Sequence, residues 1–214
     1  MDGSARVTFP AAGGGMVEGR LRHADPGAVP AGAAVLCHPH PDAGGTMDVW
    51  LLPAIGEALA AAGWTVLRFD FRSVRDGARP ADHAREQADL AGAIDFLHDT
   101  GGWTPPGRLA LVGWSFGALV ALLHGVDDPR VTDWVGIAPP TAPLPELPMA
   151  PVPRARVAGW AAHRTVIAGV HDQFFPVAGL DAVHPHVRHV LDDCDHFFFD
   201  RDREVAALVT GSLR

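Results

Sequence analysis

The fold is decided by one stretch of sequence, Leu109-Ala110-Leu111-Val112-Gly113-Trp114-Ser115-Phe116-Gly117. Its apolar start predicts a buried strand, its Gly-x-Ser-x-Gly part predicts a tight turn, and the apolar residues 118–123 predict a helix. A serine at such a strand–turn–helix junction is typical of a nucleophile elbow, which lifts the hydroxyl above the end of a sheet. The two glycines fit a strained turn that leaves little room for a Cβ. The alternative interpretation is an ordinary turn with an incidental serine.

An acid and a histidine follow later predicted strands, in the chain order that such an elbow requires. Residues 164–170 form a buried-strand pattern that ends at Asp172, and the short strand 187–191 is followed by His196. Because parallel strands end at one edge of a sheet, we expect both side chains to lie near Ser115. His196 would take the proton of Ser115, and Asp172 would orient the imidazole and stabilise its charged form.

Other residues compete for these two roles, since the chain has 12 histidines. Four rival histidines precede or lie within predicted elements: His171, His184, His186 and His189. A fifth, His163, comes before a strand and so lies at the wrong edge of the sheet. The rival acids lie close to His196 in sequence; they are Asp192, Asp193 and Asp195. We prefer Asp172 because it ends a strand of its own.

A loop of histidine, proline and glycine follows an earlier apolar strand at residues 33–37. An elbow serine needs two backbone N–H donors for the oxyanion, one from the residue after the nucleophile and one from such an early loop. Phe116 supplies the first, and we assign the second to His40 because Pro39 and Pro41 have no N–H. Two alternatives stay open: the loop is only a rigid turn, or His38 and His40 bind zinc.

With these motifs, the chain resembles the small bacterial α/β-hydrolases, in the branch related to dienelactone hydrolases. The matching blocks run in order from about residue 33 to 200; they are Leu36–Pro41, Gly44–Asp48, Leu67–Arg72, Gly113–Gly117, Gly136–Pro140 and Asp195–Phe198. The resemblance implies the α/β-hydrolase fold and hydrolytic activity. It does not imply a dienelactone substrate, because dienelactone hydrolases use cysteine where this chain has Ser115.

The order of predicted elements indicates a single domain over residues 1–214, with a mostly parallel, twisted sheet of about eight strands and helices on both faces. A hairpin of residues 6–9 and 16–21 forms an antiparallel edge. The further strands are predicted at 33–37, 64–69, 108–113, 131–138, 164–168 and 187–191. The helices are predicted near 47–62, 81–98, 116–125, 177–183 and 202–212.

Seven prolines lie between residues 139 and 153. Proline fixes φ and removes a hydrogen-bond donor, so a long helical lid cannot form in this segment. We expect a minimal, stiff cap in which Leu144, Leu147 and Met149 form an apolar wall; a surface linker is the alternative. The side chains expected to line the substrate pocket are His38, Trp114, Leu144 and Phe174, with Trp50 as a further candidate.

Composition indicates an ordinary globular enzyme domain without a cofactor. The formal net charge of −8, from 17 basic and 25 acidic residues, makes nucleic acid or an anionic membrane an unfavourable partner. No apolar run approaches the length of a membrane span, and the first 15 residues lack a signal-peptide pattern. We therefore expect a cytoplasmic monomer or homodimer. Its two cysteines form no disulfide framework.

Three functions fit these residues. The first is a serine hydrolase that cleaves a carboxylic ester, or a thioester, of a small molecule through an acyl-enzyme, with no metal and no cofactor. The second is a metal-dependent hydrolase built on the histidines. The third is a binding protein of the hydrolase fold that has no catalytic activity. Sensitivity to a chelator separates the first two.

Overall fold

The computed structural model describes residues 3–76, 83–103, 107–142, 144 and 149–213. The strands are β1 (Ala5–Pro10), β2 (Met16–Arg22), β3 (Gly32–Cys37), β4 (Trp64–Phe69), β5 (Leu109–Trp114), β6 (Asp133–Ile137), β7 (His163–Gly169) and β8 (Val187–Leu191). The α-helices are α1 (Leu51–Ala61), α2 (Ser73–Asp76), α3 (Ala84–Asp99), α4 (Phe116–Gly125), α5 (Arg154–Ala158) and α6 (Asp202–Ser212). Two 3₁₀ helices are η1 (Pro41–Ala43) and η2 (Val177–Val183).

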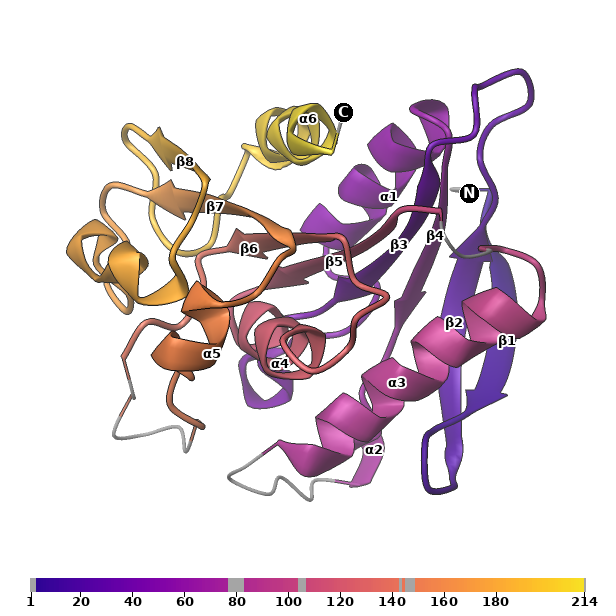
Figure 1. Cartoon of the computed structure of the whole chain (residues 1–214). Coiled ribbons are helices and arrows are strands. Elements are labelled where there is room, and N and C mark those ends of the chain that lie inside the picture. The colour runs from indigo at the N-terminus through magenta and orange to yellow at the C-terminus, as the bar shows by residue number, and fades with distance from the viewer. Residues whose placement is uncertain (1–2, 77–82, 104–106, 143, 145–148, 214) are drawn as a thin grey trace.

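The eight strands form one twisted sheet in the order β1-β2-β4-β3-β5-β6-β7-β8 (Figure 1). Strands β3 to β8 run parallel, while the hairpin β1–β2 is antiparallel and pairs with β4. The chain moves from β3 outward to β4 and then returns to the other side of β3 with β5. This reversal creates a switch point, and ligands of open α/β sheets bind at the carboxyl ends of the strands that flank it.

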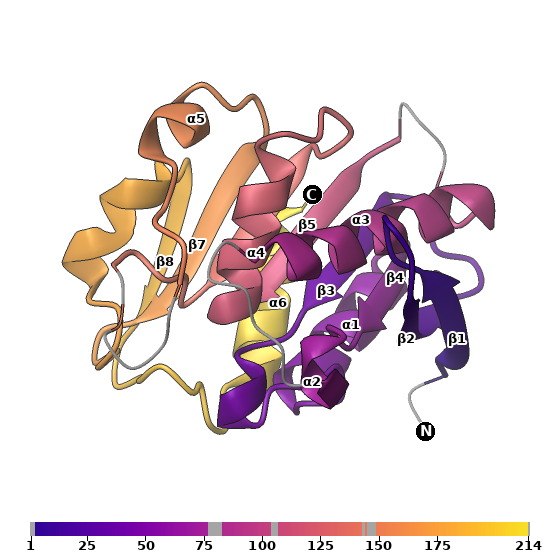
Figure 2. The same ribbon diagram turned by 90° about the horizontal axis from the view of Figure 1, so that it is seen from below.

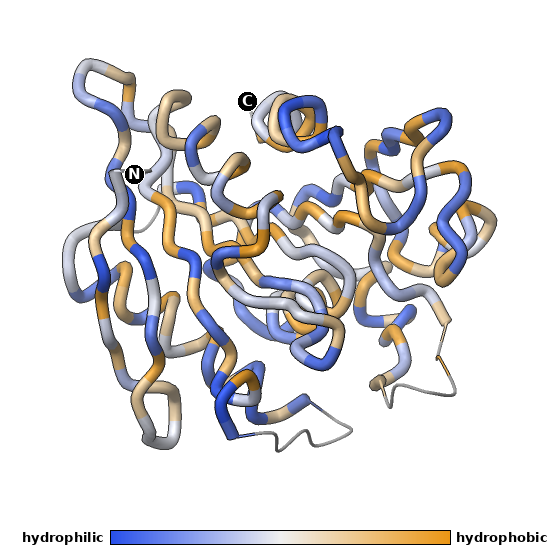
Figure 3. Tube along the Cα trace, turned by 180° about the vertical axis from the view of Figure 1, so that it is seen from behind, coloured by the Kyte–Doolittle hydropathy of each residue, from blue (hydrophilic) through white to orange (hydrophobic). Residues whose placement is uncertain are grey.

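Helices cover both faces of the sheet. In Figure 1, α1 and α6 lie above it, whereas α3, α4 and α5 lie below; Figure 2 shows the lower layer in front of the strands. Each layer packs on its own hydrophobic cluster, which includes Leu51 and Val205 on the upper face and Leu90 and Val120 on the lower face. Hydrophobic stretches accordingly run through the middle of the sheet in Figure 3. The predicted fold is therefore confirmed.

Several helix boundaries differ from the sequence prediction. The helix expected from residue 47 begins at Leu51, because tertiary contacts hold the preceding residues: Met47 donates its N–H to Asp70, and Asp48 pairs with Arg20. Residues 177–183 form a 3₁₀ helix, and the short helices α2 and α5 were not predicted.

The helix expected over 81–98 is observed as α3, and residues 81 and 82 lie outside the described part of the chain. None of the helices in the described ranges combines the length and the apolar character needed to cross a membrane.

Candidate active site

Ser115 occupies a strained turn between β5 and α4. Its φ of 53° and ψ of −118° lie outside the regions that non-glycine residues normally adopt. The two glycines of the motif make this turn possible, because a Cβ on Gly113 would overlap the backbone of Gly117, and one on Gly117 would overlap the Cys37 carbonyl. The helix that follows stabilises this strained conformation, since the Ser115 carbonyl accepts the N–H groups of Ala118 and Leu119.

The structure brings Ser115, His196 and Asp172 into one hydrogen-bonded chain. Nε2 of His196 lies 2.9 Å from Oγ of Ser115, and Nδ1 of His196 lies 2.9 Å from Oδ2 of Asp172. All three residues are buried, and the Asp172 side chain is fully so. The serine comes from the end of β5, the acid from the loop after β7 and the histidine from the loop after β8. This arrangement matches the order predicted from the sequence.

Asp172 is held in one orientation by backbone donors. Its Oδ1 accepts the N–H groups of Phe174 at 2.9 Å and Phe175 at 2.8 Å, which leaves Oδ2 for His196. None of the rival acids takes this place: Asp192 and Asp193 are exposed, and Asp195 accepts the N–H of Phe197. The loop geometry thus selects one carboxylate out of four that compete for the role in sequence.

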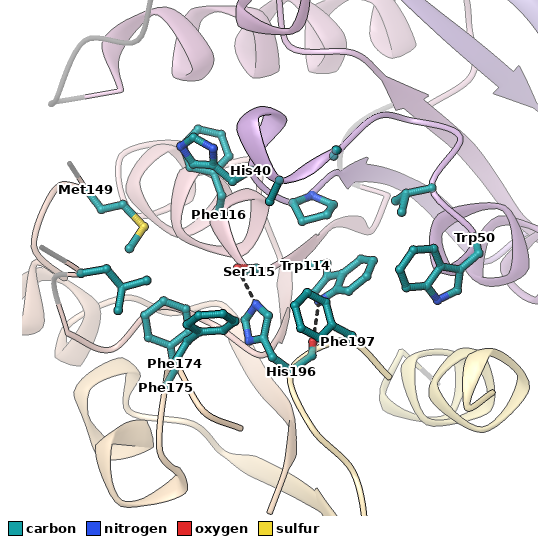
Figure 4. Close-up of a pocket in the computed structure, with 16 residues that line it drawn as sticks. His40, Trp50, Trp114, Ser115, Phe116, Met149, Phe174, Phe175, His196 and Phe197 are labelled. Carbon is teal, nitrogen blue, oxygen red and sulfur yellow. Dashed lines mark hydrogen bonds between the residues drawn. The ribbon is translucent and has the colours of Figure 1, made fainter. Parts of the chain in front are cut away.

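The loop that carries His196 is fixed by close contacts. The indole Nε1 of Trp114 donates to the His196 carbonyl at 3.2 Å (Figure 4). The His196 N–H donates to the side-chain oxygen of Gln173 at 3.4 Å. Residue 169 must be glycine, because a Cβ there would overlap the Cys194 carbonyl. Trp114, the neighbour of Ser115 in the chain, therefore also positions the histidine that faces this serine.

Phe116 and His40 lie side by side next to Ser115. Phe116 is the first residue of α4, so helix geometry leaves its N–H without an intrahelical acceptor. The His40 ring packs edge-on against the Phe116 ring, with centroids 4.9 Å apart, and its Nδ1 accepts the N–H of Asp42. Both residues line the cavity above Ser115, on the side opposite His196 (Figure 4).

His38 does not line the cavity over Ser115, so this part of the sequence prediction was wrong. The side chain is fully buried; its Nε2 accepts the N–H of Phe71 at 3.1 Å, and its Nδ1 lies 2.7 Å from the Pro39 carbonyl. Nδ1 must carry the proton, because the Phe71 N–H occupies the lone pair of Nε2. His38 therefore braces the loop that carries His40, and both of its ring nitrogens are engaged.

Burial lowers the pKa of His38 to about 4 from its ordinary 6.5. Between pH 6.5 and 4 the unfolded chain binds a proton that the folded chain does not, so stability falls as the pH falls through this window. His38→Gln, which keeps an acceptor for the Phe71 N–H, should remove about 3 kcal/mol of this pH dependence. Urea unfolding at pH 4 to 7 measures it.

His98→Gln, at an exposed position, serves as the control for that measurement. It should leave the slope of the unfolding free energy against pH as in the wild-type protein. Equal slopes for His38→Gln and the wild-type protein would contradict the bracing role of a neutral His38.

A cavity of about 130 Å³ opens directly over Ser115. Trp114, Phe174 and Leu144 line it, as expected from the sequence, and Met149 of the proline-rich segment joins them (Figure 4). Leu147 lies outside the described residues. No helix forms in the described part of residues 139–153, and Leu144 and Met149 of this segment reach the cavity.

Sequence reasoning missed several residues of this site, three of which lie near Asp172 or His196 in the chain. Phe175 and Phe197 line the cavity, and Gln173 holds the backbone of His196. Their position in the sequence could have indicated them, since they lie within three positions of Asp172 or His196. Periodicity could not reveal them, because they stand in irregular loops.

Metal-ligating side chains are not grouped in the described part of the chain. No set of three histidine, cysteine, aspartate or glutamate residues there is arranged to hold a metal ion. Cys37 and Cys194 are both buried free thiols, so Cys194 is less accessible than its place beside His196 suggests.

This fold and this site define an α/β hydrolase, and comparison with known proteins agrees. The profile of the alpha/beta hydrolase family matches residues 34–182, which is more than half of the chain. The protein therefore belongs to the alpha/beta hydrolase family. His196 lies beyond the matched residues, and its place in the site comes from the structure.

Individual relatives are distant but cover nearly the whole chain. The structure is similar to that of a Xanthomonas campestris α/β serine hydrolase without a lid, with a TM-score of 0.79 and 25% identity over 99% of this chain and 94% of that one. It shares its fold with an esterase domain from Rhodothermus marinus, with a TM-score of 0.72 and 18% identity over 99% of each chain. An uncharacterised protein of Rickettsia prowazekii is 26% identical over 93% of this chain and 84% of its own length.

Proposed function

We propose that the protein is a serine hydrolase that cleaves a carboxylic ester of a small molecule through an acyl-enzyme. The observation that carries this proposal is the hydrogen-bonded chain Ser115–His196–Asp172, which ends in an apolar cavity at the serine oxygen. A weak nucleophile such as a serine hydroxyl reacts only when a base takes its proton, and His196 is placed to do so. A thioester could be cleaved by the same groups.

In the proposed reaction, Oγ of Ser115 attacks the ester carbonyl carbon while its proton passes to Nε2 of His196. The buried carboxylate of Asp172 holds the tautomer with the proton on Nδ1 and stabilises the imidazolium. The tetrahedral intermediate then loses the alcohol, whose oxygen takes the proton from His196. Water repeats the sequence on the acyl-enzyme, releases the acid and restores the serine.

We assign the backbone N–H groups of Phe116 and His40 to the oxyanion. Phe116 has a first-turn N–H with no acceptor within α4, beside Ser115, and His40 is the residue between two prolines that can donate. Each donor of this kind is worth about 3 kcal/mol in the transition state. The cavity volume of about 130 Å³ supports a small substrate.

The experiment that tests this proposal is hydrolysis of p-nitrophenyl acetate and butanoate by the purified protein, with and without EDTA. The proposal expects turnover that EDTA leaves unchanged. Loss of activity with EDTA would replace it with a metal-dependent hydrolase. A folded protein that turns over neither ester would instead favour a non-catalytic binding protein.

A further inference from the structure

The cavity over Ser115 is too small for both halves of most esters. Its volume is about 130 Å³, and a cavity of roughly 150 Å³ in another protein holds one benzene molecule. One half of an ester, a short acyl group, fits such a space. The other half must therefore lie outside it, against the surface that borders the cavity.

Four neighbouring aromatic side chains, which we call the aromatic ladder, lead from the cavity wall to that bordering surface: Phe174, Phe197 and Trp50, which line the cavity, and Phe199, which does not. Successive ring centroids lie 6.1, 5.6 and 4.9 Å apart. The last three rings are nearly parallel, at 27° and 18°. Three separate segments of the chain supply them: the loop after β7, the loop after β8 and the start of α1.

The ladder is exposed to solvent to an unusual degree. The exposed fractions are 39% for Phe174, 42% for Trp50 and 61% for Phe199. In the described part of the chain, these are the only aromatic side chains among the exposed large hydrophobic residues. An exposed apolar patch is typical of an interaction site, and one beside a cavity fits a ligand-binding groove.

His196 determines which half of the ester meets the ladder. The leaving oxygen must approach Nε2 of His196 to receive its proton. The imidazole is flanked by the rings of Phe174, at 4.9 Å, and Phe197, at 5.6 Å, and both are steeply inclined to it. A group that departs from His196 therefore meets the first two rings of the ladder, and the alcohol half is the half that lies outside.

Charge restricts the ligand further. Among the described residues, no acidic or basic side chain other than two histidines lines the cavity, and an unpaired charge placed in such a site is costly. The exposed residue next to Phe199 is Asp200, and the chain has a net charge of −8. This charge disfavours an anionic lipid surface as the partner of the ladder.

We propose that the aromatic ladder binds the alcohol half of the substrate and that this half carries an uncharged aromatic ring, with the short acyl half in the cavity. This inference rests on the proposed function. Aromatic rings gain edge-to-face and offset-stacked contacts with one another beyond the hydrophobic effect. A saturated ring of the same size is at least as hydrophobic but lacks these contacts.

The test compares 2-phenylethyl acetate with 2-cyclohexylethyl acetate, whose leaving alcohols differ only in aromaticity. The wild-type protein should favour the phenyl ester roughly fivefold in kcat/KM, and Phe199→Leu, which removes one of the four rings, should reduce this ratio. The matched control is Met16→Leu, an exposed hydrophobic residue on β2, and should keep the wild-type ratio. A wild-type ratio of one or below, unchanged in Phe199→Leu, would overturn the proposal while hydrolysis itself stands.

A binding measurement separates this proposal from the proposed function. Ser115→Ala is titrated with 2-phenylethanol and 2-cyclohexylethanol and the affinities are measured by calorimetry. Preference for 2-phenylethanol that weakens in the Ser115→Ala, Phe199→Leu double variant supports the ladder even if no ester is hydrolysed. Equal affinities overturn it. Sedimentation that shows a dimer dissociated by Phe199→Ser also overturns it, since a second copy then covers the ladder.

Discussion

Ser115→Ala lowers kcat/KM for a short-chain ester by about 10⁴- to 10⁶-fold in our account, because no other group can form the acyl-enzyme. The variant should fold normally, since the hydroxyl makes its only side-chain contact with His196 among the bonds seen in the described residues. Steady-state kinetics with p-nitrophenyl butanoate measures the loss, and circular dichroism checks the fold.

Ser212→Ala is the matched control for this loss. Its hydroxyl bonds to the Leu208 carbonyl in α6, away from the cavity. Its activity should stay within about twofold of the wild-type value, as for most surface substitutions. Residual activity above a few per cent in Ser115→Ala would show that the serine is not the nucleophile.

Asp172→Asn has the second largest expected effect, a fall in kcat of about 10⁴-fold. The backbone N–H groups of Phe174 and Phe175 both point at Oδ1, so the amide oxygen of the introduced asparagine must take that position. Its NH₂ group then faces Nδ1 of His196 and forces the imidazole proton onto Nε2. His196 presents a donor to Ser115 and cannot accept the serine proton.

Asp195→Asn is the natural comparison, because this carboxylate lies next to His196 in sequence but bonds only to the Phe197 N–H among the described contacts. We expect its kcat within a few-fold of the wild-type value. If the two substitutions lowered kcat equally, the selection of Asp172 as the orienting acid would be wrong. Measurement of kcat from pH 5 to 9 for both variants makes the comparison independent of any one pH.

The features that sequence reasoning predicted correctly are those set by local rules. Gly113 and Gly117 have no room for a Cβ, and the apolar runs on either side specify strand and helix. Asp172 and His196 could be chosen as partners of Ser115 because the carboxyl ends of parallel strands lie at one edge of the sheet. Such topology depends on the order of elements and not on any contact between distant side chains.

The features that sequence reasoning missed depend on contacts between distant segments. His38 was expected in the pocket, yet the Phe71 N–H and the Pro39 carbonyl take both of its ring nitrogens. The start of α1 is displaced because Asp70 holds Met47. The aromatic ladder combines Trp50 with residues about 150 positions later, and no local pattern links them.

The central claim, that His196 and Asp172 activate Ser115 as a nucleophile, is tested most directly by covalent labelling. A p-nitrophenyl alkylphosphonate ester transfers its phosphonyl group to an activated serine: an Oγ–P bond forms and p-nitrophenolate leaves. Intact-protein and peptide mass spectrometry should find one phosphonyl group, on Ser115, in the wild-type protein and none in Ser115→Ala, with much slower labelling in Asp172→Asn. A label on another residue, or equal labelling of Ser115→Ala, would contradict the account.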